Sequence, residues 1–367
     1  MIFGAASFMG VPWETLIKMY RADRAGKAFN TLAEYPTDFF SFLESHPNLF
    51  PDDAQEKAAR SAMLRYAFMV LGQAIGKYDS SRKTGKREMN RIVGEEIDAE
   101  NRYVNKCKFA RGFDRTTTAD LINKYDAHLT KTISDVFGAY TVSKPRIKTL
   151  KTILVAAISK IWFNEASAGI VFAGFGTSDH YPRLVGHRCQ GLFENTLLRT
   201  KREQKEISNE NPAEIVPFAQ TEMVQTFLWG IDPDILKAVE GFISASFGEF
   251  RKNVRQDAPA AATSVSAASK AIRKQFDKDF VEYISANHAQ PIYRIIDVLS
   301  KSELAELAET LINMESLKKR ITQPIESVGG PVDVAVISKA EGVIWIKRKH
   351  YFDPDLNQDF FSRLSAK

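Results

Sequence analysis

The chain has 367 residues, of which 44% are hydrophobic and 26% are charged, and its formal net charge at pH 7 is +5. A chain of this length can bury the core of one large domain or of two ordinary ones, and its composition excludes collagen-like, disulfide-scaffold and intrinsically disordered proteins. The two cysteines, Cys107 and Cys189, stand too far apart in the sequence for a metal or redox motif, so we expect free thiols in a reducing cytoplasm.

Several apolar stretches raise the question of a membrane segment. Residues 1–13 are apolar but lack the basic region of a signal peptide. The stretches 153–163 and 168–176 are the most apolar, and Lys160 and Glu165 interrupt them well short of the length of a membrane span. We therefore expect a cytoplasmic protein with no membrane partner.

The first half of the chain predicts one strand followed by helices. Residues 1–6 have the pattern of a short apolar strand. Apolar residues at helical spacing then predict helices over 11–24, 31–46, 51–78, 116–140 and 144–165. Thr117 or Thr118 is the expected N-cap of the fourth of these helices. Residues 80–115 are polar, basic and weakly patterned, and we interpret them as a basic insertion.

The periodicity then changes to that of strands. Residues 168–176 and 181–193 predict two strands joined by a polar turn at 177–180. Helical signals return over 200–290, which we interpret as a helical insertion. It contains an Ala/Ser-rich segment without apolar periodicity at 257–270, for which a flexible connection is expected.

The C-terminal part predicts a capped helix followed by a hairpin. Ser300 and Glu303 have the spacing of a capping box at the start of a helix. Strands are expected at 331–338 and 343–349, joined by a Lys-Ala-Glu-Gly turn. Strands at the start, the middle and the end of the chain, with helices between them, predict an α+β fold.

Three pieces of this sequence, taken in order, carry a family resemblance. They are MIFGAASFMGVPWETLIKMYR at the start, IVFAGFGTSDHYPRLVGHRCQG in the middle, and LSKSELAELAETLINMESLKKRITQPIESVGGPVDVAVISKAEG near the end. Together they resemble the proteasome-type N-terminal-nucleophile (Ntn) hydrolases, which include the bacterial proteasome-like proteins. The capped helix followed by GGPVDVAVISK is the most specific of the three pieces.

The resemblance implies a fold in which two antiparallel sheets are stacked between layers of helices. The whole chain, 1–367, would form one four-layer α/β/β/α Ntn-hydrolase-like domain with the insertions 80–115 and 200–290. Two strands precede the strand that matches residues 1–6 in this family, so these strands are absent from the sequence as written. One sheet would then have an open edge, which favours docking onto a partner.

The resemblance also implies a site. In the family the nucleophile is the first residue of the mature chain, usually Thr, and its own α-amino group is the general base. That nucleophile is expected upstream of Met1, so no catalytic residue is assigned within this chain. Substrate-binding positions fall on Gly4, Gly329 and Gly330. The acid and the serine that support the nucleophile would fall on Ile325 and Val328, which departs from the family pattern.

Three functions are considered on these grounds. The first is a proteasome-like Ntn-hydrolase homologue whose ancestral activity is peptide-bond hydrolysis and which is inactive as written, a threonine peptidase only if an N-terminal segment is missing. The alternative is a non-catalytic structural or regulatory subunit, a homo-oligomer or part of a larger assembly. A nucleic-acid-associated protein is the least favoured, because the net charge is mild and acidic residues between 95 and 100 dilute the basic run.

No cofactor or metal is expected. Asp179 and His180 are metal-capable neighbours, but they have no second ligand pair at helical or hairpin spacing. Asp333 could serve in catalysis, although its place between two valines favours an ordinary strand residue. The partners expected are therefore a peptide or protein substrate and further subunits.

Overall fold

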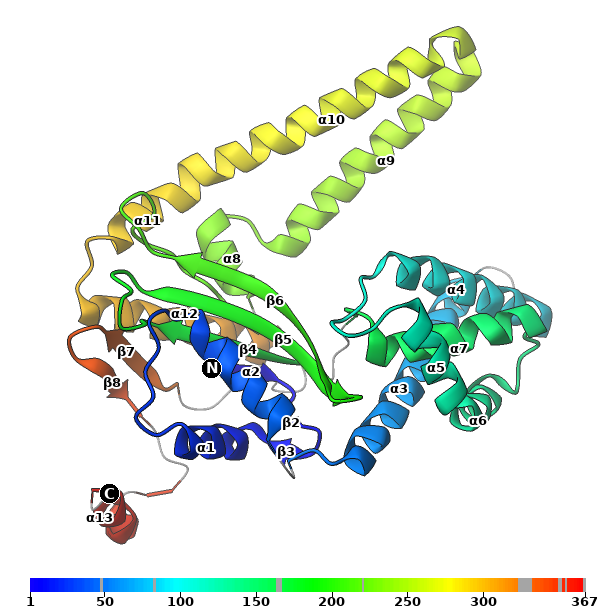
Figure 1. Ribbon diagram of the computed structural model, residues 1–367. Coiled ribbons are helices and arrows are strands. Elements are labelled where there is room, and N and C mark those ends of the chain that lie inside the picture. Colours follow the sequence, from blue (N-terminus) through cyan, green and yellow to red (C-terminus); the bar gives the residue numbers. More distant parts are fainter. Residues whose placement is uncertain are drawn as a thin grey trace. The chain divides into compact units, whose positions relative to one another are not determined.

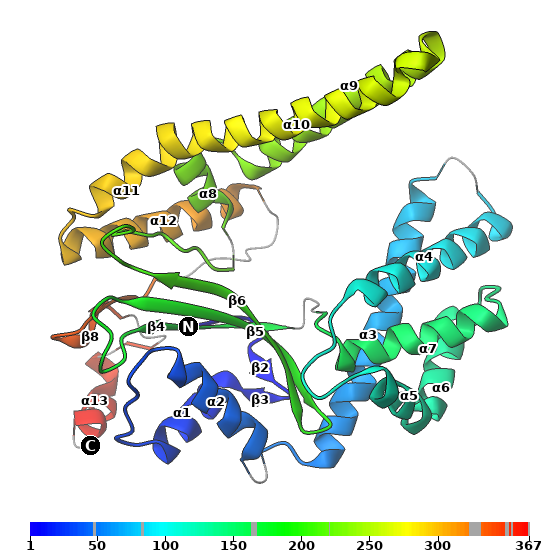
Figure 2. The same ribbon diagram turned by 45° about the horizontal axis from the view of Figure 1, so that its top comes forward.

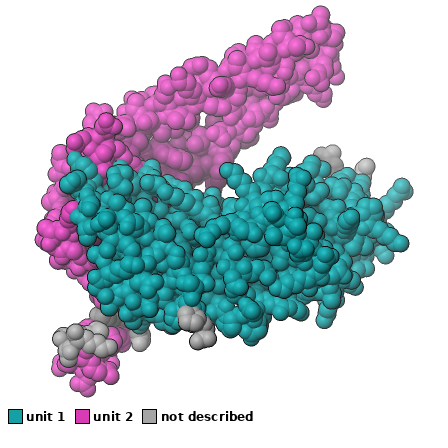
Figure 3. Space-filling view, in the orientation of Figure 1, with its two compact units in different colours: residues 1–206 teal, residues 207–367 magenta. Residues whose placement is uncertain are grey.

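The computed structural model describes residues 1–46, 49–81, 84–162, 167–219, 221–322, 332–348, 352–353 and 355–365. The chain has mixed helical and antiparallel strand structure, which confirms the α+β class. It divides into two compact units, residues 1–206 and 207–367 (Figure 3). Gly329 and Gly330, which the resemblance placed in the substrate site, lie outside the described residues.

A four-stranded antiparallel sheet organises the first unit. Its strand order is β1 (Ile2–Gly4), β4 (Ala168–Gly174), β5 (Arg183–Phe193) and β6 (Thr196–Glu206). The predicted hairpin is thus confirmed as β4 and β5. The prediction of helix from residue 200 onward is wrong at its start, because β6 continues to Glu206 as the partner of β5. Glu194 and Asn195 both have positive φ, as a two-residue hairpin turn requires.

Two helices, α1 (Trp13–Asp23) and α2 (Glu34–Ser45), cover one face of this sheet (Figure 1). The apolar side of α2 places Phe40 among the buried residues of the sheet. Between β1 and α1 the chain forms a small hairpin of β2 (Ser7–Phe8) and β3 (Val11–Pro12). The predicted first and second helices are confirmed, and the predicted strand 1–6 is shortened to β1.

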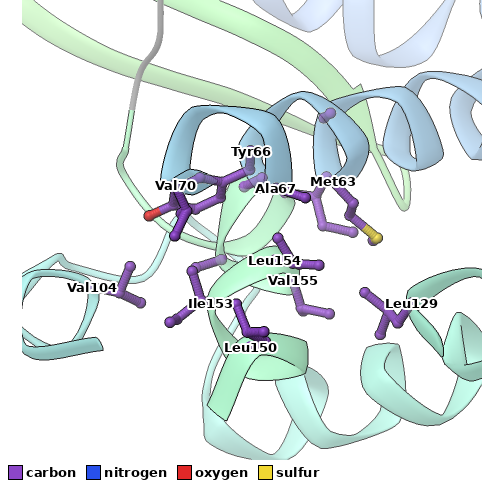
Figure 4. Packing of buried hydrophobic residues seen from close by; sticks show 14 of the residues in the cluster. Met63, Tyr66, Ala67, Val70, Val104, Leu129, Leu150, Ile153, Leu154 and Val155 are labelled. Carbon is purple, nitrogen blue, oxygen red and sulfur yellow. The ribbon is translucent and has the colours of Figure 1, made fainter. Parts of the chain in front are cut away.

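A bundle of helices makes up the rest of the first unit (Figure 2). Its members are α3 (Asp52–Asp79), α4 (Lys86–Lys106), α5 (Arg115–Lys124), α6 (Asp126–Phe137) and α7 (Lys144–Ser159). Figure 4 shows Met63 and Tyr66 of α3 close to Leu154 of α7, and Leu154 belongs to the apolar stretch 153–163. All three of these side chains are fully buried.

Two predictions for this bundle are corrected. The weakly patterned segment 80–115 is helical over most of its length, because α4 occupies it and places Ile97 in the core. The single helix expected over 116–140 is two helices that meet at Tyr125. The N-cap of α5 is Asp114, whose side chain accepts a hydrogen bond from the backbone N–H of Thr117 at 2.8 Å. The hydroxyl of Thr117 accepts from the backbone N–H of Asp114, which completes a capping box.

The second unit is mainly helical. Its helices are α8 (Glu222–Trp229), α9 (Pro233–Asp257), α10 (Ala262–Ile284), α11 (Gln290–Ile296), α12 (Lys301–Thr322) and α13 (Gln358–Ser365). The segment 257–270 is not irregular but consists of the end of α9, a 3-10 turn and the first turns of α10. Within the described residues, no helix combines the length and the apolar character needed to cross a membrane.

The C-terminal part of this unit follows the sequence prediction. At the start of α12, the backbone N–H of Ser300 donates to the carboxylate of Glu303 at 2.8 Å, and the backbone N–H of Glu303 donates to the hydroxyl of Ser300 at 3.3 Å. The capping box is therefore confirmed. The predicted hairpin is confirmed as β7 (Val334–Ser338) and β8 (Gly342–Lys347), which pair antiparallel in a sheet of their own.

Candidate functional site

Gly4, the one predicted substrate-binding residue that the structure describes, ends strand β1 against β4. Its φ is +82°, and a Cβ at this position would lie 2.7 Å from the carbonyl oxygen of Ser167. Both the left-handed backbone and the close approach of Ser167 therefore require glycine here. The ring of Phe3 covers Gly169, so a glycine on β4 likewise makes room for the β1 side chain.

Besides the close approach of its carbonyl oxygen to Gly4, Ser167 makes a side-chain hydrogen bond to the neighbouring strand. Its hydroxyl accepts a hydrogen bond of 2.6 Å from Nε of Arg188, which lies on β5. Burial, and secondarily the charge of Arg202, lowers the pKa of Arg188. Gly4, the last residue before the turn, therefore packs closely against Ser167, and Ser167 is in turn hydrogen-bonded to β5.

A groove of about 630 Å³ begins directly after β1, and we call it the β1–α3 groove. One wall is the turn that joins β1, β2 and β3, another is the exposed side of α3, and the floor comes from β5. The residues that line it are Ala5, Ser7, Met9, Gly10, Asp53, Ala54, Lys57, Ala58, Ser61, Arg65, Gln190 and Phe193.

The turn that forms the first wall is rigidly built. Met9 and Gly10 have φ of +52° and +88°, the pair of left-handed residues that closes a tight two-residue hairpin between β2 and β3. The backbone N–H of Leu192 donates to Sδ of Met9 at 3.1 Å, and the indole Nε1 of Trp13 donates to the carbonyl of Ala5 at 3.1 Å. These contacts hold the turn beside the groove.

Polar groups enter the groove from α3 and from β5. Asp53, Lys57, Ser61 and Arg65 follow one another at four-residue intervals, so they share one face of α3. Arg65 donates to the hydroxyl of Ser61 at 2.7 Å. On β5, Nε2 of Gln190 donates to the carbonyl of Ala157 at 3.0 Å, while its buried Oε1 has no partner among the described residues.

This arrangement suits recognition more than covalent chemistry. The lining holds two serine hydroxyls, two cations and one carboxylate but neither a histidine nor a cysteine, among the residues that the structure describes. The Ser61 hydroxyl accepts from a guanidinium, which cannot take up its proton and so cannot act as its general base. The side chains of the lining therefore supply hydrogen-bond donors and acceptors of both charge signs.

The other residues singled out from the sequence have structural surroundings. The carboxylate of Asp179 is buried; it accepts 2.8 Å hydrogen bonds from the backbone N–H groups of Leu32 and Gly176 and pairs with Arg183 at 3.2 Å. It fixes the β4–β5 connection to the loop before α2. Asp333 lies just before β7. Within the described ranges, no group of three or more His, Cys, Asp and Glu residues could hold a metal ion.

Sequence reasoning missed the α3 side of the groove. The signal was present, since polar residues at 53, 57, 61 and 65 make a stripe at helical spacing on a helix that was correctly predicted. Only the fold shows that this stripe faces the turn after β1 instead of open solvent. A comparison of the chain with protein-family models, with curated proteins and with solved structures found no match.

Proposed function

We propose that this chain is a homologue of the proteasome-type Ntn hydrolases that binds extended peptide segments in the β1–α3 groove and acts as a non-catalytic, partner-binding subunit. The observation that carries the proposal is the junction of an edge strand with a polar groove. In the described part of the chain, β4 is the single strand that pairs with β1, and the groove starts at the next residue, Ala5.

An extended peptide can use such a junction by adding a strand. The unpaired N–H and C=O groups of an edge strand supply main-chain hydrogen bonds, and pockets beside it select alternate side chains. The two cations of the groove, Lys57 and Arg65, outnumber its single carboxylate, Asp53, so acidic peptides are favoured.

The finer architecture is part of the same proposal. In a four-layer sandwich, the sheet β1-β4-β5-β6 would be one of the two stacked sheets, and the hairpin β7–β8 would belong to the other. Two features support this assignment: the capping box of α12 precedes the hairpin as in the resembling family, and the apolar side chains of β8, Val343 to Ile346, are exposed in this structure. Exposed apolar strand residues are expected to meet a further layer or a partner.

The peptide proposal is tested by anisotropy of a fluorescein-labelled acidic octapeptide. We expect saturable binding by the whole chain and a loss of about tenfold or more in affinity when alternate backbone amides of the peptide are N-methylated, because N-methylation removes the donors that a β-strand needs. The double variant Lys57→Ala/Arg65→Ala should lose a similar factor. Arg60→Ala is the matched control, since Arg60 is an exposed cation of α3 outside the groove.

Two outcomes would overturn the proposal. Equal affinity for the N-methylated peptide, or no saturable binding, would show that β1 and the groove do not pair with a peptide. Mass spectrometry of the same mixture after incubation gives the second arm, because progressive cleavage of the peptide would contradict the non-catalytic role and favour the hydrolase.

A further inference from the structure

A second cavity, independent of the β1–α3 groove and of the function proposed for it, opens in the helical bundle of the first unit. It has a volume of about 600 Å³ and lies between the C-terminal end of α4, the start of α5 and the last turns of α7. We call it the cationic pocket. Its lining residues are Asn105, Lys106, Cys107, Lys108, Phe109, Arg115, Thr118, Ala119, Ile122, Thr152, Ala156, Ser159 and Lys160.

The charges of this lining have a single sign. Lys106, Lys108, Arg115 and Lys160 line the pocket, and no aspartate or glutamate does. In the described part of the chain none of these four side chains forms an ion pair, whereas several other cations of the bundle do, Arg146 with Asp98 among them. A concave site lined by unneutralised cations concentrates positive potential and attracts anions.

Among the lining residues, Lys160 gives the strongest indication that the pocket is an anion-binding site. It is buried, and its Nζ donates to the carbonyl of Val104 at 2.8 Å and lies 4.6 Å from the centre of the Phe109 ring. Burial lowers the pKa of Lys160, and the charge of Arg115 acts in the same direction. A buried cation without a carboxylate is costly to the fold, and an anionic ligand would remove that cost.

The pocket is preformed. The segment after α4 pairs with the end of α7: the backbone N–H of Ala110 donates to the carbonyl of Ser159 at 2.9 Å, and that of Ile161 donates to the carbonyl of Lys108 at 2.8 Å. Phe109 and Ile122 add apolar surface to its walls. A site of this volume with apolar walls and a few placed charges has the character of a small-molecule site.

We propose that the cationic pocket binds a small organic phosphate of mononucleotide size. The phosphoryl group would lie against Lys106, Lys108 and Arg115, since guanidinium and ammonium groups are the donors that phosphate oxygens accept best. The organic part would pack on Phe109 and Ile122. Lys160, which lines the pocket and is buried, supplies a fourth positive charge that water screens little.

Calorimetric titration of the whole chain with adenosine monophosphate tests this assignment. We expect saturable binding, no binding of adenosine, and weaker binding of inorganic phosphate, because the proposal needs both the charge and the apolar contact. The double variant Lys108→Ala/Arg115→Ala should weaken binding of adenosine monophosphate by about tenfold or more. Lys131→Ala, an exposed cation of α6 outside the pocket, should change it by less than about twofold.

Two further measurements separate loss of binding from loss of fold. Lys160→Met keeps the length of the side chain, and Val104 retains a second donor in the N–H of Cys107 at 3.1 Å, so this variant should melt at or above the parent temperature while it binds less. The thiol of Cys107 lines the pocket, whereas that of Cys189 is buried. Adenosine monophosphate should therefore slow the labelling of Cys107 by a disulfide reagent.

Several results would overturn the inference. Equal affinity for adenosine and adenosine monophosphate would show that the cations of the pocket do not bind the phosphate group. An unchanged affinity in Lys108→Ala/Arg115→Ala, or unaltered labelling of Cys107, would place the ligand elsewhere. If a single-stranded oligonucleotide bound while adenosine monophosphate did not compete, and Lys131→Ala weakened it as much as the double variant, the bundle would be an open polyanion surface and not a pocket.

Discussion

Replacement of Gly4 by alanine tests how tightly the turn after β1 is held. The chain offers a matched control in Gly10, six residues later. Gly4 and Gly10 have φ of +82° and +88°, so a Cβ strains both backbones to a similar degree. At Gly4 the added Cβ would lie 2.7 Å from the carbonyl oxygen of Ser167, whereas at Gly10 it would meet nothing within 4 Å. The difference between the two variants isolates the close approach to Ser167.

The expected losses of unfolding free energy follow from the backbone strain at positive φ and from the contact with Ser167. A left-handed conformation costs an L-residue about 1–2 kcal/mol, and the reduced freedom of the unfolded chain returns about 0.4–1 kcal/mol. Gly10→Ala should therefore lose about 1 kcal/mol of unfolding free energy. Gly4→Ala carries the same strain and an overpacking cost of about 1–3 kcal/mol, because backbone and not a flexible side chain must move. Its total loss should be about 2–4 kcal/mol.

Urea denaturation followed by tryptophan fluorescence measures both losses. Trp13 is a local reporter, since its ring lies 5.0 Å from Phe8 and its indole N–H donates to Ala5 in the same turn. The slope of the transition must stay constant for the comparison to hold. Equal losses in Gly4→Ala and Gly10→Ala would refute the reasoning, because the contact with Ser167 would then contribute nothing.

Three other side chains give predictions of their own. Burial, together with the charges of two neighbouring cations on β6, lowers the pKa of His187 from 6.5 to about 4. The folded state therefore keeps the imidazole neutral at pH values where the unfolded state already protonates it. The unfolding free energy is highest above pH 6.5, and up to about 3 kcal/mol of it is lost as the pH falls toward 4. In His187→Leu the urea concentration at the unfolding midpoint should vary less with pH over that range than in the parent. The same pH dependence of the midpoint in variant and parent would contradict this. Burial raises the pKa of Glu100, whose carboxylate accepts a 2.5 Å hydrogen bond from Tyr66, so its contribution is favourable below pH 4.5 and is lost as the pH rises. Glu100→Gln should therefore gain about 1 kcal/mol at pH 7 and nothing at pH 4, and a gain independent of pH would argue against a charged, buried carboxylate. Glu303→Ala breaks the capping box of α12 and should lower the melting temperature by the equivalent of about 0.5–1 kcal/mol, while Glu306→Ala, exposed one turn later, should leave it unchanged.

Local signals predicted much of the fold correctly. The hairpins β4–β5 and β7–β8 followed from alternation and turn residues, and the start of α12 followed from Ser300 and Glu303. Each of these depends on residues within a few positions of one another. The strand β6 was missed for a related reason: its second half is a run of charged and polar residues, and only its pairing with β5 makes it a strand.

Buried charge explains why α4 was hidden. Glu96 and Glu100 occupy buried positions of this helix, where Lys77 pairs with Glu96 and the hydroxyl of Tyr66 donates to Glu100. A sequence pattern counts these carboxylates as solvent-facing residues and loses the helical stripe. Their partners lie on α3, so the exception becomes visible only when the two helices are packed together.

The sequence by itself determined the order and type of most elements, the α+β class and the caps and turns that bound several elements, because these depend on short-range periodicity and backbone conformation. The tertiary structure alone decided which strand pairs with β1 and which side chains meet in the β1–α3 groove and the cationic pocket. β1 pairs with a strand that begins at Ala168, and Lys106 and Lys160, from distant parts of the sequence, line the same pocket. Such contacts depend on the packing of distant segments, and no local pattern encodes it.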